Sequence, residues 1–279
     1  MSFFPEIDRV IELFKFPLRQ RALIGGILTG AMGGFLGSFA ILRQLSFFSD
    51  ALAHTLLLGI SLGVLLGSEP TTFVLPSAVL FALGVSYLLE KTQLGSDALL
   101  NIIFSASLAL AIVILGATEG YQGGLESLLF GDILAVRTSD LVVSGLLLCA
   151  CIGFIGLTLN TQMLLNIDES MAVAQGVSVS THRTIFVVLL SLVVGTSLTG
   201  VGALLVSAFI VIPACAARLL SKGFISYVMR SVIIGVLSAV VGMVLSARFN
   251  LQSGPSIVLV QTGIFFTAIA ISKVRTISA

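Results

Sequence analysis

The chain alternates long apolar runs with short polar or glycine-containing connections over its 279 residues. A helix needs roughly 20 mainly apolar residues to cross the hydrocarbon core of a bilayer, and most of the runs are about that long. The boundary at residues 198–202 allows either a sharp turn or one kinked helix, so we expect eight or nine spans. The pattern therefore predicts an all-α membrane helical bundle with spans at about residues 22–42, 46–67, 71–90, 98–118, 139–160, 184–200, 202–220, 230–248 and 255–272.

The residues before the first run differ from the rest of the chain. Residues 1–21 mix charged side chains with phenylalanine, isoleucine, leucine and valine, and they lack the basic-then-apolar order of a cleaved signal peptide. A mixed pattern of this kind is typical of an amphipathic helix that lies along the membrane surface. We expect residues 1–21 to form a retained interfacial segment and residues 22–279 to form one transmembrane domain.

Composition agrees with a membrane protein and excludes one class of partner. Hydrophobic residues make up 57% of the chain and charged residues only 10%, and the mean hydropathy is +1.15. The charged share of soluble domains is about 25%. The formal net charge is +1, and no lysine or arginine run with interleaved aromatics is present, so nucleic acid is excluded as a partner.

Charge also indicates an orientation, because basic residues favour the cytoplasmic side of short loops. With nine spans, an inside carboxy terminus collects most loop lysines and arginines there, including Arg43, Lys91 and Arg183. The basic cluster before the first span opposes this arrangement, although acidic residues accompany it. The loops favour an outside amino terminus and an inside carboxy terminus.

Two ionisable side chains lie inside the second predicted span. Asp50 and His54 are four residues apart, which places both on one face of a helix with Cβ atoms roughly 6 Å apart. An ionisable residue in hydrocarbon is expensive and marks a candidate functional position. If Arg43 marks the inner interface, the helical rise puts the pair about 10 to 16 Å into a core roughly 30 Å thick. The pair therefore lies near the middle of the membrane.

Three roles fit this pair. A carboxylate oxygen and a neutral imidazole nitrogen are both ligands for zinc or manganese, and a two-fold dimer would supply four such ligands. The pair can instead form a buried ion pair or hydrogen bond that fixes helix packing, or it can relay protons. Asn101, Ser105 and Ser207 are further polar residues within predicted spans and are candidates for lining a pathway.

The longest polar connection, residues 166–182, predicts a short helix on the cytoplasmic side. Asp168 is suited to cap its amino end, Glu169 lies in its first turn, and Gly176 is suited to end it. Such a surface helix can dock another protein. The alternative is a plain loop that contains a helical turn.

Signatures of hydrolytic enzymes are missing from the sequence. It contains no His-Glu-x-x-His, no Gly-x-Ser-x-Gly and no Gly-x-x-x-x-Gly-Lys-Ser/Thr segment. We therefore expect a protein that is not an enzyme, and any ATP that drives transport must be hydrolysed by a separate polypeptide.

The sequence resembles the permease subunits of bacterial zinc, manganese and iron ABC importers. The resemblance covers about residues 25–272, in order and at family spacing. It is carried by Gly37-Ser-Phe-Ala-Ile-Leu-Arg-Gln-Leu-Ser-Phe-Phe-Ser-Asp-Ala-Leu-Ala-His-Thr-Leu-Leu-Leu-Gly59, by Leu129-Phe-Gly-Asp-Ile-Leu-Ala-Val136, by residues 202–206 and 212–218, and by Ser253-Gly-Pro-Ser-Ile-Val-Leu259.

This resemblance implies a homodimeric permease of the type II importer class in the bacterial plasma membrane. It implies two cytoplasmic ATP-binding subunits, an extracytoplasmic metal-binding protein that delivers the ion, and no permanently bound cofactor. Asp50 and His54 match the positions that the family uses as a metal site. Residues 168–182 resemble the coupling helix, with Glu169, Ala172 and Gly176 in the family's loose pattern.

The resemblance gives conflicting indications of the transported metal. Some zinc-type relatives carry a histidine where this chain has Ser105, so residues 101–107 look more like manganese or iron types, whereas residues 129–136 look more like zinc types. Two other functions remain open. A vitamin or siderophore permease would need a wide apolar cavity, and an ion-coupled secondary carrier would need no ATPase.

Overall fold

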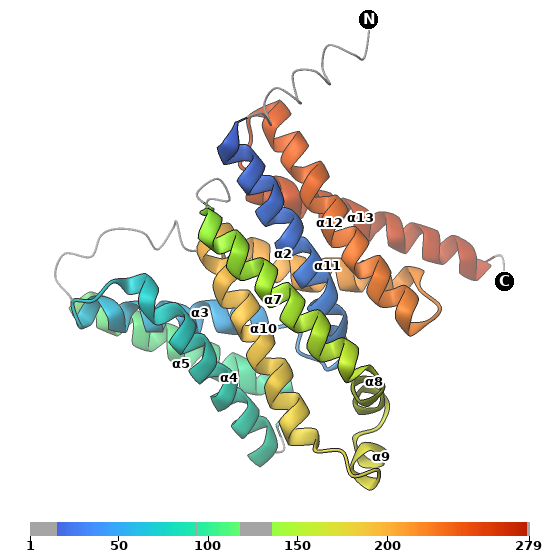
Figure 1. Cartoon of the computed structure of the whole chain (residues 1–279), viewed down its shortest axis with the longest axis horizontal. Coiled ribbons are helices and arrows are strands. Elements are labelled where there is room, and N and C mark those ends of the chain that lie inside the picture. Colours follow the sequence, from blue (N-terminus) through green and yellow to red (C-terminus); the bar gives the residue numbers. More distant parts are fainter. Residues whose placement is uncertain (1–15, 93, 118–135, 278–279) are drawn as a thin grey trace, which may run out of the picture. The chain divides into compact units, whose positions relative to one another are not determined.

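Nine helices in the described residues are long and apolar enough to cross a membrane. The computed structural model describes residues 16–92, 94–117 and 136–277, and these contain helices and turns but no strand (Figure 1). The predicted all-α membrane bundle is thereby confirmed, with nine spans. They are α2 (Pro17–Leu42), α3 (Phe48–Leu65), α4 (Val74–Lys91), α5 (Ser96–Ala117), α7 (Thr138–Leu157), α10 (Val179–Val201), α11 (Ala203–Leu220), α12 (Phe224–Phe249) and α13 (Ser253–Ile277).

Three shorter helices complete the described chain. The 3₁₀ turn η1 (Pro70–Phe73) precedes α4, and α8 (Leu159–Ile167) and α9 (Glu169–Ala174) lie between α7 and α10. The ambiguous boundary near residue 200 is a break between helices. Gly202 has a φ of +89° between α10 and α11, a conformation that side chains other than glycine rarely adopt.

Several helices begin earlier than hydropathy predicts. The chain becomes helical at Pro17 rather than residue 22, at Val179 rather than 184, and at Phe224 rather than 230. A charged residue lies at or next to two of the predicted starts, 184 and 230, and each of these charged residues has a partner in the structure. Arg183 pairs with Glu169, and Arg230 donates to the backbone carbonyl of Leu220 at the end of α11. Residues 1–15 of the predicted interfacial segment (1–21) fall outside the described residues. So do residues 129–135 of the segment 129–136 that carries part of the family resemblance.

The described chain divides into two compact units. The first contains residues 16–41, 136–145 and 197–277, and its principal helices are α2, α11, α12 and α13. Helix α11 packs on α12 and α13, and α12 packs on α13. Helix α2 joins this unit through its glycines: a Cβ atom on Gly30 would lie 2.6 Å from the carbonyl oxygen of Gly235 in α12. The chain therefore uses close backbone approach to pack α2 inside one subunit.

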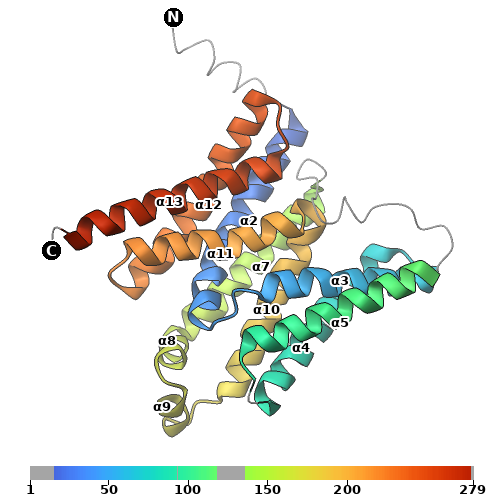
Figure 2. The same ribbon diagram turned by 180° about the vertical axis from the view of Figure 1, so that it is seen from behind.

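The second unit contains the described parts of residues 42–124 together with residues 146–196. In it α3 packs on α4, α5 and η1, and Figure 2 shows α3, α4 and α5 as a group beside one another. Helices α8 and α9 contact each other, while α7 and α10 contribute residues to both units. The side of α5 turned away from α3 is largely exposed, with Ile102, Ile112 and Val113 each about 60% exposed or more.

Candidate functional site

Asp50 and His54 lie in the first two turns of α3. Helix α3 begins at Phe48, so Asp50 is in its first turn and His54 follows one turn later. Residues 43–47 are not helical, so the predicted depth near the middle of the membrane, which assumed a helical rise from Arg43, does not follow. Both residues are half-buried, whereas residues 51–53 between them are buried. They therefore occupy the least covered face of α3, which continues through Leu58 to Leu62.

The His54 ring is held in a defined state by its own helix. Its Nδ1 atom lies 2.9 Å from the backbone carbonyl oxygen of Asp50. Because a carbonyl oxygen can only accept, Nδ1 is the donor, and Nε2 of the neutral imidazole keeps its lone pair. A backbone contact of this kind fixes the tautomer and orientation of metal-binding histidines. Nε2 is therefore the ring nitrogen that could bind a metal ion.

Helix α5 supports this part of α3. The Phe104 ring meets the His54 ring edge to face at 4.5 Å between centroids and also contacts Phe47, at 5.6 Å. Thr55 donates through Oγ1 to the Ala51 carbonyl at 2.9 Å and to Oγ of Ser107 at 3.1 Å. These contacts restrict the imidazole on the side that faces α5.

The predicted pathway residues divide between the two units. Asn101 and Ser105 are exposed on α5, one turn apart and adjacent in sequence to the residues that support His54. Ser207 belongs to α11, where its hydroxyl lies 3.3 Å from the Ala203 carbonyl oxygen and 3.2 Å from that of Leu204. The structure thus brings Asn101 and Ser105, but not Ser207, into the same unit as Asp50 and His54.

As a candidate metal site, the pair alone would be incomplete. In the part of the chain that the structure describes, no group of three or more histidine, cysteine, aspartate or glutamate residues is placed to hold a metal ion. Asp50 and His54 can supply two ligands of the types that zinc and manganese accept. Further ligands for a passing ion have to come from water, backbone or another chain.

The second predicted site, residues 168–176, forms the short helix α9 with a defined end at each side. The Asp168 carboxylate accepts from the backbone amides of Ser170 at 2.8 Å and Met171 at 3.2 Å. At the other end Gly176 has a φ of +77°, and the amides of Gly176 and Val177 donate to the carbonyls of Val173 and Ala172. This pair of bonds is a Schellman motif.

The surface of α9 combines one buried anchor with exposed apolar side chains. Ala172 is fully buried, while Met171 is 53% exposed and Val173 is 61% exposed. Glu169 accepts from Arg183 of α10 at 2.5 Å. The helix is therefore attached to its own chain on one face and presents apolar side chains on another.

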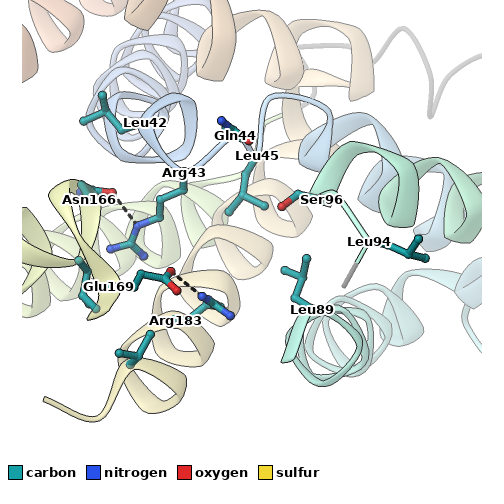
Figure 3. A pocket seen from close by; sticks show the side chains of 12 residues that line it. Leu42, Arg43, Gln44, Leu45, Leu89, Leu94, Ser96, Asn166, Glu169 and Arg183 are labelled. Carbon is teal, nitrogen blue, oxygen red and sulfur yellow. Dashed lines mark hydrogen bonds and ion pairs between the residues drawn. The ribbon is translucent and has the colours of Figure 1, made fainter. Parts of the chain in front are cut away.

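Arg43 occupies a cavity beside α9 that sequence analysis did not identify as a site. The cavity measures about 280 Å³ and is lined by residues of the α2–α3 connection and of α4, α8, α9 and α10 (Figure 3). Arg43 donates through Nε to Oδ1 of Asn166 at 3.2 Å and through Nη2 to Oε1 of Gln162. Its guanidinium carbon lies 4.2 Å from the centroid of the Phe186 ring.

The electrostatic surroundings of Arg43 are unfavourable for a charge. Burial and, to a smaller extent, repulsion from Arg183 lower the pKa of Arg43 to about 10, with Glu169 partly offsetting them. The sequence signal was only a basic residue at the end of a span. Its partners lie 119 and 123 residues away along the chain, so only the fold reveals them.

Comparison with known proteins gives consistent matches over nearly the whole chain. The profile of the ABC 3 transport family matches residues 15–272. The manganese transport system membrane protein MntC of Listeria monocytogenes is 32% identical, over 92% of this chain and 91% of that protein. The high-affinity zinc uptake system membrane protein ZnuB of Haemophilus influenzae is 29% identical, over 90% of this chain and 96% of that protein.

A solved structure matches the chain at a sequence identity similar to that of these two relatives. The structure of PsaBC from Streptococcus pneumoniae in complex with Fab aligns with a TM-score of 0.80 and 30% identity, covering 94% of this chain and 95% of that one. The sequence match and the structural match extend over almost the same length. The arrangement of helices is therefore that of a known membrane transport fold.

Proposed function

The chain belongs to the ABC 3 transport family, and on this premise we propose that it is the permease subunit of an ATP-binding-cassette importer for zinc or manganese. It is a multi-pass protein of the bacterial plasma membrane and acts as a transport subunit rather than an enzyme. Relatives named for manganese and zinc transport support this substrate class. The sequence contains no phosphate-binding loop, so ATP is hydrolysed by a partner subunit.

The observation that carries the proposal is the pair Asp50 and His54 on the least covered face of α3. The Nδ1 contact to the Asp50 carbonyl leaves Nε2 of His54 available to the ion, and the Asp50 carboxylate supplies a charge of opposite sign. Two ligands hold a divalent ion loosely, which suits an ion that has to leave again. A homodimer would double the set to four, with each copy contributing the same pair.

The proposal includes two protein partners. Helix α9, with Asp168 and Gly176 at its ends and Glu169 and Ala172 attaching it to the chain, is the coupling helix that the cytoplasmic ATPase receives. An extracytoplasmic metal-binding protein delivers the ion on the opposite side of the membrane. The proposed pathway residues Asn101 and Ser105 lie in the same unit as Asp50 and His54, whereas Ser207 belongs to α11 in the other unit.

Substitution of the pair tests the metal role directly. Asp50→Ala and His54→Ala should each reduce metal uptake at least about tenfold, because metal sites that lose a ligand or its support lose affinity on that scale. Dimer assembly and ATPase binding should be retained. The chain offers a matched control for the aspartate, since Asp97 also lies in the first turn of a span.

Asp97→Ala should leave uptake within about twofold of the unaltered protein. Unchanged uptake in Asp50→Ala or His54→Ala would return the pair to a purely structural role. Uptake measured with competing zinc, manganese and ferrous iron identifies the metal. Failure to copurify any ATP-binding subunit would favour an ion-coupled carrier instead.

A further inference from the structure

Arg43 connects two parts of the second unit that the proposed function treats separately. It follows the last residue of α2 and precedes α3, which begins at Phe48 and carries Asp50 and His54. Its guanidinium reaches α8, which ends one residue before the Asp168 cap of α9. One side chain thus bridges the start of the metal-binding helix and the base of the coupling helix.

The bridge is built from groups that fit a guanidinium specifically. Gln162 is fully buried and offers Oε1, while its amide nitrogen is already engaged with Thr158 at 3.2 Å. Asn166 offers Oδ1, and its amide donates back to the Gln162 carbonyl at 2.8 Å. Both acceptors are therefore oriented before Arg43 arrives, and the fully buried Phe186 ring lies beneath the guanidinium carbon.

The turn that follows Arg43 needs such support. Gln44 has a φ of +56°, a left-handed conformation that residues other than glycine, asparagine and aspartate rarely adopt without help from their surroundings. Its side chain is exposed, and its backbone conformation sets the direction in which the chain enters α3. The contacts of Arg43, directly before Gln44, are one set of interactions that can hold this turn.

The α9 side of the same cavity contains a second link. Arg183 pairs with Glu169 in the first turn of α9 and lines the cavity together with Arg43 (Figure 3). Glu169 belongs to α9, and Asn166 belongs to α8, which contacts α9. A movement of α9 would therefore act on both side chains and, through Glu169, on Arg183, all of which lie around the Arg43 guanidinium. Arg43 is positioned to transmit that change to the turn before α3.

Resting on the proposed function, we infer that Arg43 is a positioning residue that couples the coupling helix α9 to the Asp50–His54 helix α3. We name Arg43, Gln162 and Asn166 the Arg43 latch. While the latch is closed, α9 and the start of α3 move as one body when an ATPase subunit engages α9. When the latch is broken, the ATPase can work without moving the metal-binding helix.

The test measures coupling rather than activity alone. The full permease is reconstituted in proteoliposomes with its ATP-binding subunit and the metal-loaded binding protein, and initial metal uptake and ATP hydrolysis are measured on the same sample. Arg43→Gln should lower the number of ions moved per ATP by about tenfold, within the usual range of coupling between sites. ATP hydrolysis should stay within about twofold.

Arg43→Lys, which keeps the charge but not the fork that reaches two acceptors, should give an intermediate ratio. Arg230→Gln is the matched control, since Arg230 also bonds a helix end but in the other unit, and its ratio should stay within about twofold. An unchanged ratio in Arg43→Gln, or a parallel fall of uptake and hydrolysis, would overturn the inference.

A second measurement covers the case in which Arg43→Gln fails to fold. Spin labels at Ser170→Cys in α9 and Leu62→Cys in α3, in a background without Cys149, Cys151 and Cys215, report the distance between the two helices. When the ATPase binds, the distribution of this distance should stay narrow with the latch intact, and it should broaden or shift in Asn166→Leu. Identical distributions would contradict the latch.

The two proposals fail in different samples. If the proposed function is wrong, the unaltered chain will neither retain an ATP-binding subunit nor move metal. If only the latch is wrong, the unaltered chain will transport normally and the Arg43 and Asn166 variants will resemble it in coupling ratio and interhelical distance.

Discussion

Different kinds of contact between helices are prominent inside each of the two units of this chain. In the unit of α2, α11, α12 and α13, backbones approach directly: a Cβ on Gly33 would lie 2.8 Å from Phe209, and a Cβ on Gly34 would lie 2.5 Å from the Ser231 carbonyl oxygen. In the unit of α3, α4, α5, α8 and α9, charged and amide side chains reach across long sequence separations, as the Arg43 latch does.

This difference separates a fixed scaffold from an adjustable one. Helices in a membrane gain little from hydrophobic association, so close packing of small residues and hydrogen bonds between helices hold them together. Backbones in contact fit in one arrangement only, because interfaces packed at this density are not continuously deformable. Side-chain hydrogen bonds can be exchanged for others. We call the unit of α2, α11, α12 and α13 the fixed unit and the unit of α3, α4, α5, α8 and α9 the exchangeable unit. The residues proposed to bind the ion and to receive the ATPase all lie in the exchangeable unit, apart from Ser207.

The largest expected effect comes from adding one methyl group to the fixed unit. In Gly37→Ala the new Cβ would overlap the backbone carbonyl of Ile210, and backbone cannot move aside as a flexible side chain can. We expect a loss of about 3 kcal/mol in stability, the upper end for overpacking, seen as loss of monodisperse protein or a lower unfolding temperature in detergent.

Gly263→Ala is the matched control for this substitution. It lies in the same unit, in α13, and no atom lies within 4 Å of its new Cβ. Stability should stay the same or rise by up to about 1 kcal/mol, since glycine inside a helix is unfavourable. Equal behaviour of the two variants would remove the distinction between the units.

A smaller effect is expected from the amino end of α9 in the exchangeable unit. Asp168→Ala removes both acceptor contacts to the Ser170 and Met171 amides, and loss of a helix cap costs about 1 kcal/mol. This corresponds to a fall of several-fold in affinity for the ATP-binding subunit, measured by titration in nanodiscs. Asp168→Asn keeps a capping oxygen and should restore most of the affinity; equal loss in both variants would indicate that charge, rather than capping, matters.

The smallest effect tests whether hydrogen bonds matter in the fixed unit once its backbones are in contact. Tyr227 donates to the Ser38 carbonyl at 3.0 Å in a buried position. Tyr227→Phe should cost about 0.6 kcal/mol, the average for hydrogen bonds between membrane helices, measured by thermal unfolding. Tyr87, 61% exposed in α4, provides the control Tyr87→Phe, which should be silent. A loss above about 2 kcal/mol in Tyr227→Phe would show that polar contacts hold both units.

Sequence reasoning succeeded where a feature is local. Apolar runs predict the spans because each helix satisfies its own backbone in the membrane. The same holds for the short helix of residues 169–174, since Asp168 and Gly176 act on neighbouring amides and carbonyls. The spacing of Asp50 and His54 likewise needed only the helix period.

The features that escaped prediction depend on distant partners. Hydropathy began two spans too late because it counted Arg183 and Arg230 as boundaries, whereas each charge has a partner outside its own helix. Arg43 looked like a topology marker because nothing near it in sequence indicates Gln162 or Asn166. The Nδ1 contact of His54 is local, but its significance depends on the lone pair that it leaves free at Nε2.

In helix α9 the residues that determine the helix differ from the exposed residues that are proposed to meet the ATP-binding subunit. Its shape is specified by Asp168 before it and by Gly176 after it, and Ala172 alone is buried inward. The exposed positions between them, Met171 and Val173 among these, carry almost no responsibility for forming the helix. If α9 is the coupling helix, as proposed, its exposed side chains can change together with the partner surface while the residues that form the helix stay the same.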